Sequence, residues 1–324
     1  MNAKATMLAD SISAVTGKRI CSLEIEFARI VLAEQNTHNA ISKNASSSRA
    51  IPVKTMLEQI RNNPAMPARF GKANTGMQDA GEHNALIYLP YSDDEGNQIV
   101  LGPEEAWAYC ANVTADLAQA WHDAGYAKQI CNRWVETSQM MKMVITATDW
   151  NNYDWLRIHD AADPTIADLA EKIKAARDAS TPVVLQPGEW HVPYYNDGVW
   201  KPFKESIGGL VVDKFGHSLE HALVISSSCC AQVSYRKLDD TIEKARSVVA
   251  RLNLNGEEPD QPVHASPLEH QASPIKPVAN SDVGYPELWP EGVTHMDRDG
   301  MFCSGNLKGF IQHRQLVPNH VKRG

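Results

Sequence analysis

Residues 20–27 read Ile20-Cys21-Ser22-Leu23-Glu24-Ile25-Glu26-Phe27. Their second half alternates strictly between apolar and acidic side chains. A period of two residues is typical of a strand that buries one of its faces. We therefore expect a strand at residues 20–27 that opens the fold, with Leu23, Ile25 and Phe27 in the core.

The residues after this strand predict a short helix, a loop and a second helix. Apolar side chains at positions 30, 31 and 33 suit the short helix. Residues 36–49 are rich in Ser and Asn and show no apolar period, which is typical of a loop. Pro52 suits the first turn of a helix that continues to Asn62.

The middle of the chain is predicted to be mainly helical. The clearest helix begins at Pro103, where a proline and two acids favour a helix start, and it ends at Gly125. Residues 255–290 contain many prolines, and their composition fits either a solvated linker or an ordered binding loop. We expect further helices at residues 127–137, 153–157, 164–179, 217–230 and 239–252, short strands at 183–212, and one more strand at 305–317.

Composition limits the kind of partner. The chain has 324 residues, and a hydrophobic content of 43% can fill a substantial core. A total of 31 Lys and Arg against 39 Asp and Glu gives a net charge of −8, which opposes binding to a nucleic-acid polymer or an anionic membrane. No apolar run has the length of a membrane span, and residues 1–16 lack the apolar core of a signal peptide. We expect a cytoplasmic protein. Its six cysteines show no paired C-x-x-C spacing, so we expect them to be free thiols.

One candidate site lies in the polar stretch from Thr37 to Arg49. Serine hydroxyls, the guanidinium of Arg49 and the free N–H groups of the helix that begins at Pro52 could meet around one anion. The same residues also fit an ordinary serine-rich turn. The residues alone leave both interpretations open.

A second candidate cluster lies at residues 152–157. Tyr153 and Arg157 are four residues apart, so they would share one helical face with Asn152 at its edge. This pattern fits a surface pair as well as a binding site.

Two histidine clusters could suggest a metal. Residues 264–270 contain two His, a Ser and a Glu, but their spacing is not that of a zinc helix. His217 and His221 lie near two adjacent cysteines, which rarely reach one ion together. We expect no metal site.

The candidate anion stretch resembles the signature of the flavin-dependent thymidylate synthases. That signature is Arg-His-Arg, seven residues and Ser, with an Arg two positions later. This chain has Thr37-His38-Asn39, then residues 40–46, then Ser47-Ser48-Arg49. Residues 147–157 are similar to the family's Asn- and Arg-bearing helix, with Asn152 and Arg157 at the matching positions.

A third agreement occurs out of the usual order. Residues 231–235, Ala-Gln-Val-Ser-Tyr, and residues 264–270, His-Ala-Ser-Pro-Leu-Glu-His, resemble a block that precedes the signature in the family. Here the block follows the signature, so we expect a circularly permuted relative, most similar to versions encoded by large bacteriophages. The resemblance implies an α+β fold with helices packed on an antiparallel sheet. The expected parts are residues 1–180 with the signature strand, phosphate-binding loop and helical region, 181–216 as an irregular insertion, and 217–324 as the permuted segment of the same catalytic domain.

The resemblance implies an enzyme that transfers a methylene group to C5 of dUMP, with FAD as cofactor and methylenetetrahydrofolate and NADPH as co-substrates. It implies that Arg157 is the catalytic residue and binds the pyrimidine. It also implies that Ser47, Ser48 and Arg49 bind the nucleotide phosphate, with Glu34 near the nucleotide. The residues implied to line the flavin are His38, Asn44, Asn152, His264 and Ser266.

Thr37 and Asn39 replace two arginines that the family places beside the flavin, so Lys43 or another subunit would have to supply the charge. The family builds its sites between the subunits of a homotetramer, and we expect the same here. Two alternatives stay open. One is the same chemistry on another pyrimidine nucleotide such as dCMP, giving a methyl or hydroxymethyl product; the other is a non-catalytic nucleotide-binding protein.

Overall fold

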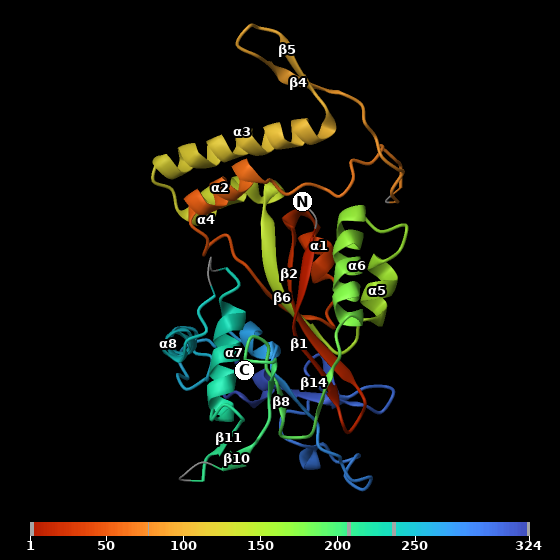
Figure 1. Cartoon of the computed structure of the whole chain (residues 1–324), viewed down its shortest axis with the longest axis vertical. Helices are drawn as coiled ribbons and strands as arrows, with labels where there is room; N and C mark the ends of the chain where they lie inside the picture. The colour runs from red at the N-terminus through yellow and green to blue at the C-terminus, as the bar shows by residue number, and fades with distance from the viewer. Residues whose placement is uncertain (1–2, 77, 206–208, 235–237, 323–324) are drawn as a thin grey trace.

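A five-stranded sheet forms the centre of the computed structural model, which describes residues 3–76, 78–205, 209–234 and 238–322 (Figure 1). The strand order is β3-β6-β2-β1-β7. All neighbours run antiparallel except β7, which pairs with β1 in parallel. The strands are β1 Lys4–Ser13, β2 Arg19–Ala28, β3 Ser42–Ala45, β6 Met140–Ala147 and β7 Val183–Leu185. The fold is therefore α+β, as expected.

The predicted strand at residues 20–27 is confirmed as β2, and its apolar face lies in the core. It does not open the fold, because β1 precedes it and pairs with it. The reason for this error is that β1 buries polar residues. Asp10 is ion-paired with Arg19, and Ser11 is hydrogen-bonded to His191, so β1 lacks an apolar alternation.

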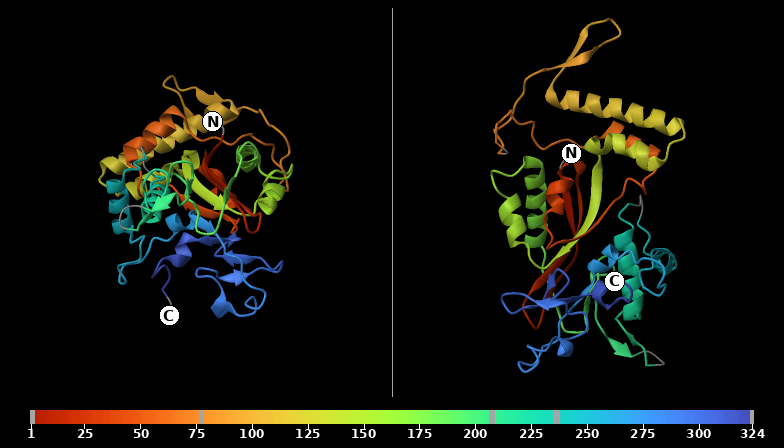
Figure 2. Two further views of the ribbon diagram at one scale, coloured as in Figure 1. Left: turned by 60° about the horizontal axis from the view of Figure 1, so that its bottom comes forward. Right: turned by 180° about the vertical axis from the view of Figure 1, so that it is seen from behind.

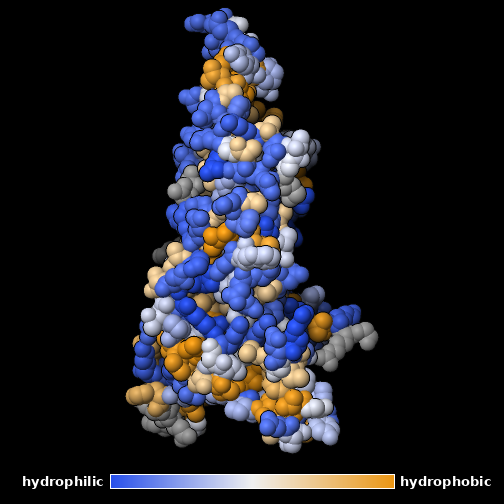
Figure 3. All heavy atoms as spheres, turned by 90° about the vertical axis from the view of Figure 1, so that its right-hand side faces the viewer, coloured by the Kyte–Doolittle hydropathy of each residue, from blue (hydrophilic) through white to orange (hydrophobic). Residues whose placement is uncertain are grey.

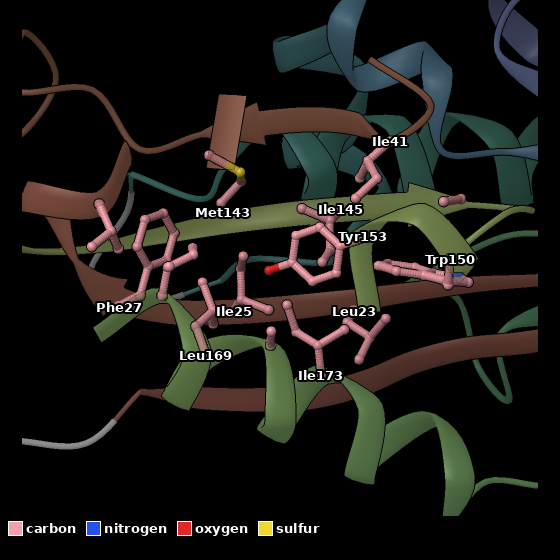
Figure 4. Packing of buried hydrophobic residues seen from close by; sticks show 14 of the residues in the cluster. Leu23, Ile25, Phe27, Ile41, Met143, Ile145, Trp150, Tyr153, Leu169 and Ile173 are labelled. Atoms are coloured by element: carbon pink, nitrogen blue, oxygen red, sulfur yellow. The ribbon is translucent and has the colours of Figure 1, made fainter. Parts of the chain in front are cut away.

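Two helices cover one face of the sheet, α5 (Asn151–Arg157) and α6 (Pro164–Asp178). Helix α6 begins where the Asp163 carboxylate accepts from the N–H groups of Thr165 and Ile166. Figure 4 shows their apolar side chains meeting those of β2 and β6. Each fully buried Leu or Ile side chain contributes roughly 1.5–3 kcal/mol to this packing. The labelled residues of this core are Leu23, Ile25, Phe27, Ile41, Met143, Ile145, Trp150, Tyr153, Leu169 and Ile173.

The opposite face of the sheet carries a buried chain of polar groups. His191 contacts Ser11 Oγ through Nδ1 at 2.9 Å and Ser22 Oγ through Nε2 at 2.8 Å. Ser22 Oγ lies 2.5 Å from Thr146 Oγ1, which lies 2.8 Å from His270 Nδ1. Because all five side chains are fully buried, these hydrogen bonds fix the carboxyl-terminal half of the chain on the sheet.

A helical layer and a projecting hairpin occupy the upper end of the molecule in Figure 1. The view from behind in Figure 2 also shows that the β4–β5 hairpin projects from the rest of the molecule. Figure 3 shows a mainly hydrophilic surface with apolar groups below the hairpin tip and at the opposite end. The elements of this end are α2 Val53–Asn62, β4 Ile87–Ser92, β5 Gln98–Leu101, α3 Pro103–Asp123, α4 Lys128–Cys131 and η2 Asn132–Ser138. The short elements η1 Arg29–Val31 and α1 Leu32–Asn36 follow β2 and pack against the core beside the sheet.

The carboxyl-terminal half combines two helices with a four-stranded sheet of order β16-β12-β8-β9. Its helical elements are α7 Leu219–Ala231, α8 Ile242–Leu252, η3 Ser266–Glu269, η4 Pro286–Leu288 and η5 His313–Leu316. Its strands are β8 Trp190–His191, β9 Val199–Trp200, β10 Lys204–Glu205, β11 Val211–Val212, β12 Ala272–Pro274, β13 His295–Met296, β14 Phe302–Ser304, β15 Leu307–Lys308 and β16 Phe310–Gln312.

The expected helices are present within a few residues, although the segment at 127–137 is split into α4 and η2. One expectation is wrong, because residues 36–49 are not only a loop but contain β3. The middle of the chain is mainly helical, as predicted, but it also contains β6, which was not predicted. Residues 255–290 contain η3, β12 and η4 and bury His270, which is the structure of an ordered segment rather than a solvated linker. None of the helices among the described residues is long and apolar enough to cross a membrane.

Candidate functional site

His38 and Arg157 lie 119 residues apart in sequence and are in direct contact. Arg157 Nε donates to His38 Nε2 at 2.9 Å. Arg157 Nη2 donates to the carbonyl oxygen of Glu34 at 3.2 Å and to Thr37 Oγ1 at 3.0 Å. Helix α5 thus anchors its arginine on the turn after α1, and Nη1 of Arg157 makes no hydrogen bond within the described residues.

His38 is held as a neutral imidazole. Burial, and after it the positive charges of Arg157 and Lys43, lower the pKa of His38 from 6.5 to about 4. Its Nε2 accepts from Arg157, so the single proton of the neutral ring belongs on Nδ1. The ring therefore orients the guanidinium without adding a second positive charge.

Tyr153 completes this cluster from the same helical face as Arg157. Its ring contacts the His38 ring edge-on at 4.8 Å, and its hydroxyl donates to Gln35 Oε1 at 2.9 Å. Within the described residues, Glu34 Oε2 and Gln35 Nε2 are buried without a hydrogen-bond partner. A buried polar atom without a partner is costly, which indicates a place for polar groups of a ligand. The sequence predicted Glu34 here but missed Gln35, because nothing in its neighbourhood signals a buried amide.

Lys43 places a positive charge at the same turn. Its Nζ donates to the carbonyl oxygens of His38 at 2.5 Å and Ile41 at 3.1 Å. Burial lowers the pKa of the ammonium group from its usual value. Lys43 therefore adds a positive charge to the turn that contains Thr37 and Asn39.

Asn44 joins β3 to two distant segments. Its Nδ2 donates to the carbonyl oxygen of Cys230 at 2.5 Å, and its Oδ1 accepts from Ser266 Oγ at 2.9 Å. These contacts bring residues 37–49 together with Cys230 and with the segment 264–270. Tyr235, the last residue of the predicted segment 231–235, lies outside the described residues.

Ser47, Ser48 and Arg49 form a turn beyond the other end of β3. The backbone N–H of Ser47 donates to Ser234 Oγ at 2.8 Å, and its own Oγ accepts from the backbone N–H of Arg49 at 3.2 Å. Ser48 Oγ faces Glu136 Oε1 at 3.5 Å, while the side chain of Arg49 is exposed. Asn132 fixes this turn, because its Nδ2 donates to the carbonyl oxygens of Ser48 and Ile51.

The candidate residues are therefore split into sets at the two ends of β3. His38 and Arg157 lie before the strand and the Ser47–Arg49 turn after it, and four strand residues span about 10 Å. Alternate residues of β3 also face different partners, with Lys43 toward His38 and Asn44 toward Ser266. Asn152 and His264 are exposed. The structure of one chain does not place all these residues around one ligand.

The histidine clusters do not form a metal centre. His217 and His221 stack face to face with centroids 4.0 Å apart, an arrangement that does not direct two ring nitrogens at one ion. Within the part of the chain that the structure describes, no group of three or more His, Cys, Asp and Glu side chains is arranged to hold a metal ion.

No family model matches this chain, and no curated protein matches its sequence. Among solved structures it is similar to the crystal structure of thymidylate synthase X (ThyX) from Helicobacter pylori with FAD and dUMP. The identity is 14% and the TM-score 0.31, and the match covers 49% of this chain and 67% of that chain.

Proposed function

We propose that this protein is a flavin-dependent enzyme of the thymidylate synthase type. The contact of Arg157 with His38, beside the unpartnered Glu34 Oε2, carries the proposal, because it joins the signature stretch to the arginine helix. Two hydrogen bonds support the proposal, one between the side chains of Asn44 and Ser266 and one from the Ser47 N–H to Ser234 Oγ. They join residues 37–49 to the segments 231–235 and 264–270, which resemble the block that precedes the signature in the family. These contacts favour a circularly permuted relative of the flavin-dependent thymidylate synthases, in which residues 1–180 and 217–324 form one catalytic domain and residues 181–216 form an insertion.

Arg157 is the residue that we propose to bind the pyrimidine. Its Nη1 donors and the acceptor Glu34 Oε2 match the O4 and N3–H groups of uracil. Because three hydrogen bonds already fix the guanidinium, it can stabilise negative charge that develops on the ring without reorganising. The same pair matches N3 and N4–H of cytosine, so dCMP is the second candidate substrate.

The polar groups along β3 fit a flavin in part. His38, Asn44 and Ser266 offer neutral hydrogen-bonding groups, and Lys43 offers the positive charge that Thr37 and Asn39 lack. Bound reduced FAD would supply the hydride, with methylenetetrahydrofolate as methylene donor and NADPH as reductant. We propose that Asn152 and His264, which are exposed, reach the flavin only in a homotetramer.

The phosphate of the nucleotide is assigned to Ser47, Ser48 and Arg49. The exposed Arg49 guanidinium and the Ser47 hydroxyl beside it suit a phosphate, and the Ser48 hydroxyl would join them by leaving the Glu136 carboxylate. In one chain this turn lies beyond the far end of β3 from Arg157, so we propose that a neighbouring subunit supplies it to each site.

The test begins with the visible absorbance of the purified protein before and after incubation with FAD. The flavin-loaded protein is then given NADPH, methylenetetrahydrofolate and either dUMP or dCMP, and the nucleotide product is identified by mass spectrometry. We expect bound oxidised flavin and methylation of dUMP. Protein that never binds flavin would contradict the proposal and favour a non-catalytic nucleotide-binding protein.

Arg157→Ala should lower turnover about 100-fold or more, because the fixed charge at the pyrimidine is lost, while flavin loading stays intact. Arg133→Ala is the matched control, since Arg133 is exposed and lies in η2, away from these contacts. Equal turnover in Arg157→Ala and the wild type would remove Arg157 from the mechanism.

A further inference from the structure

A pocket of about 620 Å³ lies between α7 and α8, two helices that pack against each other in the lower half of Figure 1. Aliphatic side chains form its walls, and a volume of this size is typical of small-molecule sites. The wall residues are Leu219, Leu223, Val224, Val249, Leu254 and Leu268.

Two residues that line this pocket, Ser227 and His313, each carry a buried polar atom without a partner within the described residues. Ser227 is 1% exposed, and its Oγ has no hydrogen-bond partner within the described residues. The hydroxyls of its two neighbours on α7 have hydrogen-bond partners: Ser226 Oγ donates to the carbonyl oxygen of Pro193, and Ser228 Oγ accepts from Gln232. An unpartnered buried hydroxyl is costly, and Ser227 is the one of the three whose residue borders the pocket.

His313, which lines the same pocket, adds a second such group. Its Nδ1 is buried without a partner within the described residues, and its ring packs edge-on against Trp190. Burial lowers the pKa of His313 to about 4, so the ring is neutral near pH 7. The inner polar groups are therefore uncharged.

The charges that border the pocket are of both signs. Arg246, Glu220 and Glu257 all line it and are exposed to solvent. A charged ligand group placed among the aliphatic walls would lose its hydration without a counter-charge at Ser227 or His313.

We propose that this pocket binds an uncharged amphipathic small molecule, with an aliphatic body between α7 and α8 and one hydroxyl or carbonyl group at Ser227 and His313. The site is separate from the candidate site at β3 and does not depend on the proposed function. Helix α7 connects the two, because the carbonyl of Cys230 near its end accepts from Asn44. A ligand here would therefore contact a helix that also holds the candidate site.

The test uses 1-octanol, octanoate and octylammonium as probes of equal chain length, titrated into the full chain and followed by ligand-observed NMR. We expect 1-octanol to bind and both charged probes to bind at least about tenfold more weakly. Ser227→Ala should weaken 1-octanol binding about fivefold, the loss of one neutral hydrogen bond. Ser247→Ala is the control, since Ser247 is an exposed serine of α8 that does not line the pocket, and it should bind like the wild type.

A second variant tests the walls. Ala250 lines the pocket from α8 and is exposed, so Ala250→Leu fills space with little effect on folding. It should reduce 1-octanol binding several-fold. The proposal is overturned by a wild type that binds no 1-octanol up to its solubility. It is also overturned if the single variants Ala250→Leu and Ser227→Ala both bind 1-octanol with wild-type affinity.

Discussion

Gly198 illustrates how one residue couples two parts of the chain. Its φ is +81°, and an added Cβ would lie 2.7 Å from Ala9 Cβ and 2.9 Å from the carbonyl oxygen of Leu8. Gly188 has a φ of +90° but no atom within 4 Å of an added Cβ. A left-handed backbone costs a non-glycine residue about 1 kcal/mol, and overpacking adds about 2 kcal/mol.

We predict that Gly198→Ala lowers the free energy of unfolding by about 2 kcal/mol more than Gly188→Ala, measured by urea denaturation. The matched glycine removes the backbone effect from the comparison. Equal losses in the two variants would contradict a close approach of the turn between β8 and β9 to β1. The segment 181–216, which was expected to be an insertion, would then not pack against β1 of the central sheet at Gly198.

The candidate site was partly predictable at this scale. The spacing of Tyr153 and Arg157 predicted a shared helical face, and both residues contact His38. The buried, unpartnered atoms of Glu34 and Gln35 could not be predicted, because burial of one atom depends on packing between segments that are distant in sequence. The roles assigned to these residues stay predictions.

At the scale of elements, the buried chain of hydroxyls and imidazoles predicts a dependence of stability on pH. Burial lowers the pKa of His191 and of His270 to about 3, and a histidine in the unfolded chain titrates near 6.5. Between these values the unfolded state binds more protons than the folded state. The free energy of unfolding therefore falls as pH falls below about 6.5, by up to about 1.4 kcal/mol per pH unit for each histidine.

We predict that His270→Gln reduces this slope between pH 6.5 and 4.5, measured by urea denaturation at several pH values. Its side chain can keep the hydrogen bond to Thr146 but cannot bind a proton. His122→Gln is the control, since His122 is exposed, and it should keep the wild-type slope. The same slope in both variants would mean that His270 does not titrate as a buried group.

The errors in the predicted elements share one physical cause. Strand β6 is covered on both faces, so seven of its eight residues are buried and no period of two is visible in its sequence. Strand β3 is polar because Ser42 and Asn44 hydrogen-bond to Asn306 and Ser266, which are more than 200 residues away. Helices α2, α3 and α6 were predictable because proline and capping signals are local.

At the scale of the whole molecule, the separation of Arg157 from the Ser47–Arg49 turn predicts sites shared between subunits. In the proposed enzyme, each site takes Arg157 from one subunit and Arg49 from a neighbouring subunit. The variants Arg157→Ala and Arg49→Ala therefore each remove one of the two arginines, and each removes it from a different subunit of the site. The two inactive variants, co-expressed with different tags and purified as mixed oligomers, should then regain about a quarter of wild-type methylation, because random mixing leaves both arginines in about one site in four.

Light scattering separates the two ways in which this prediction can fail. A chain that is monomeric when loaded with FAD and dUMP would rule out shared sites directly. Mixed oligomers of the expected mass that stay inactive would place both arginines in the same chain's site, which would require β3 to be rearranged from its pairing with β6. Each variant alone must be inactive and of wild-type mass, because residual activity in either would imitate complementation.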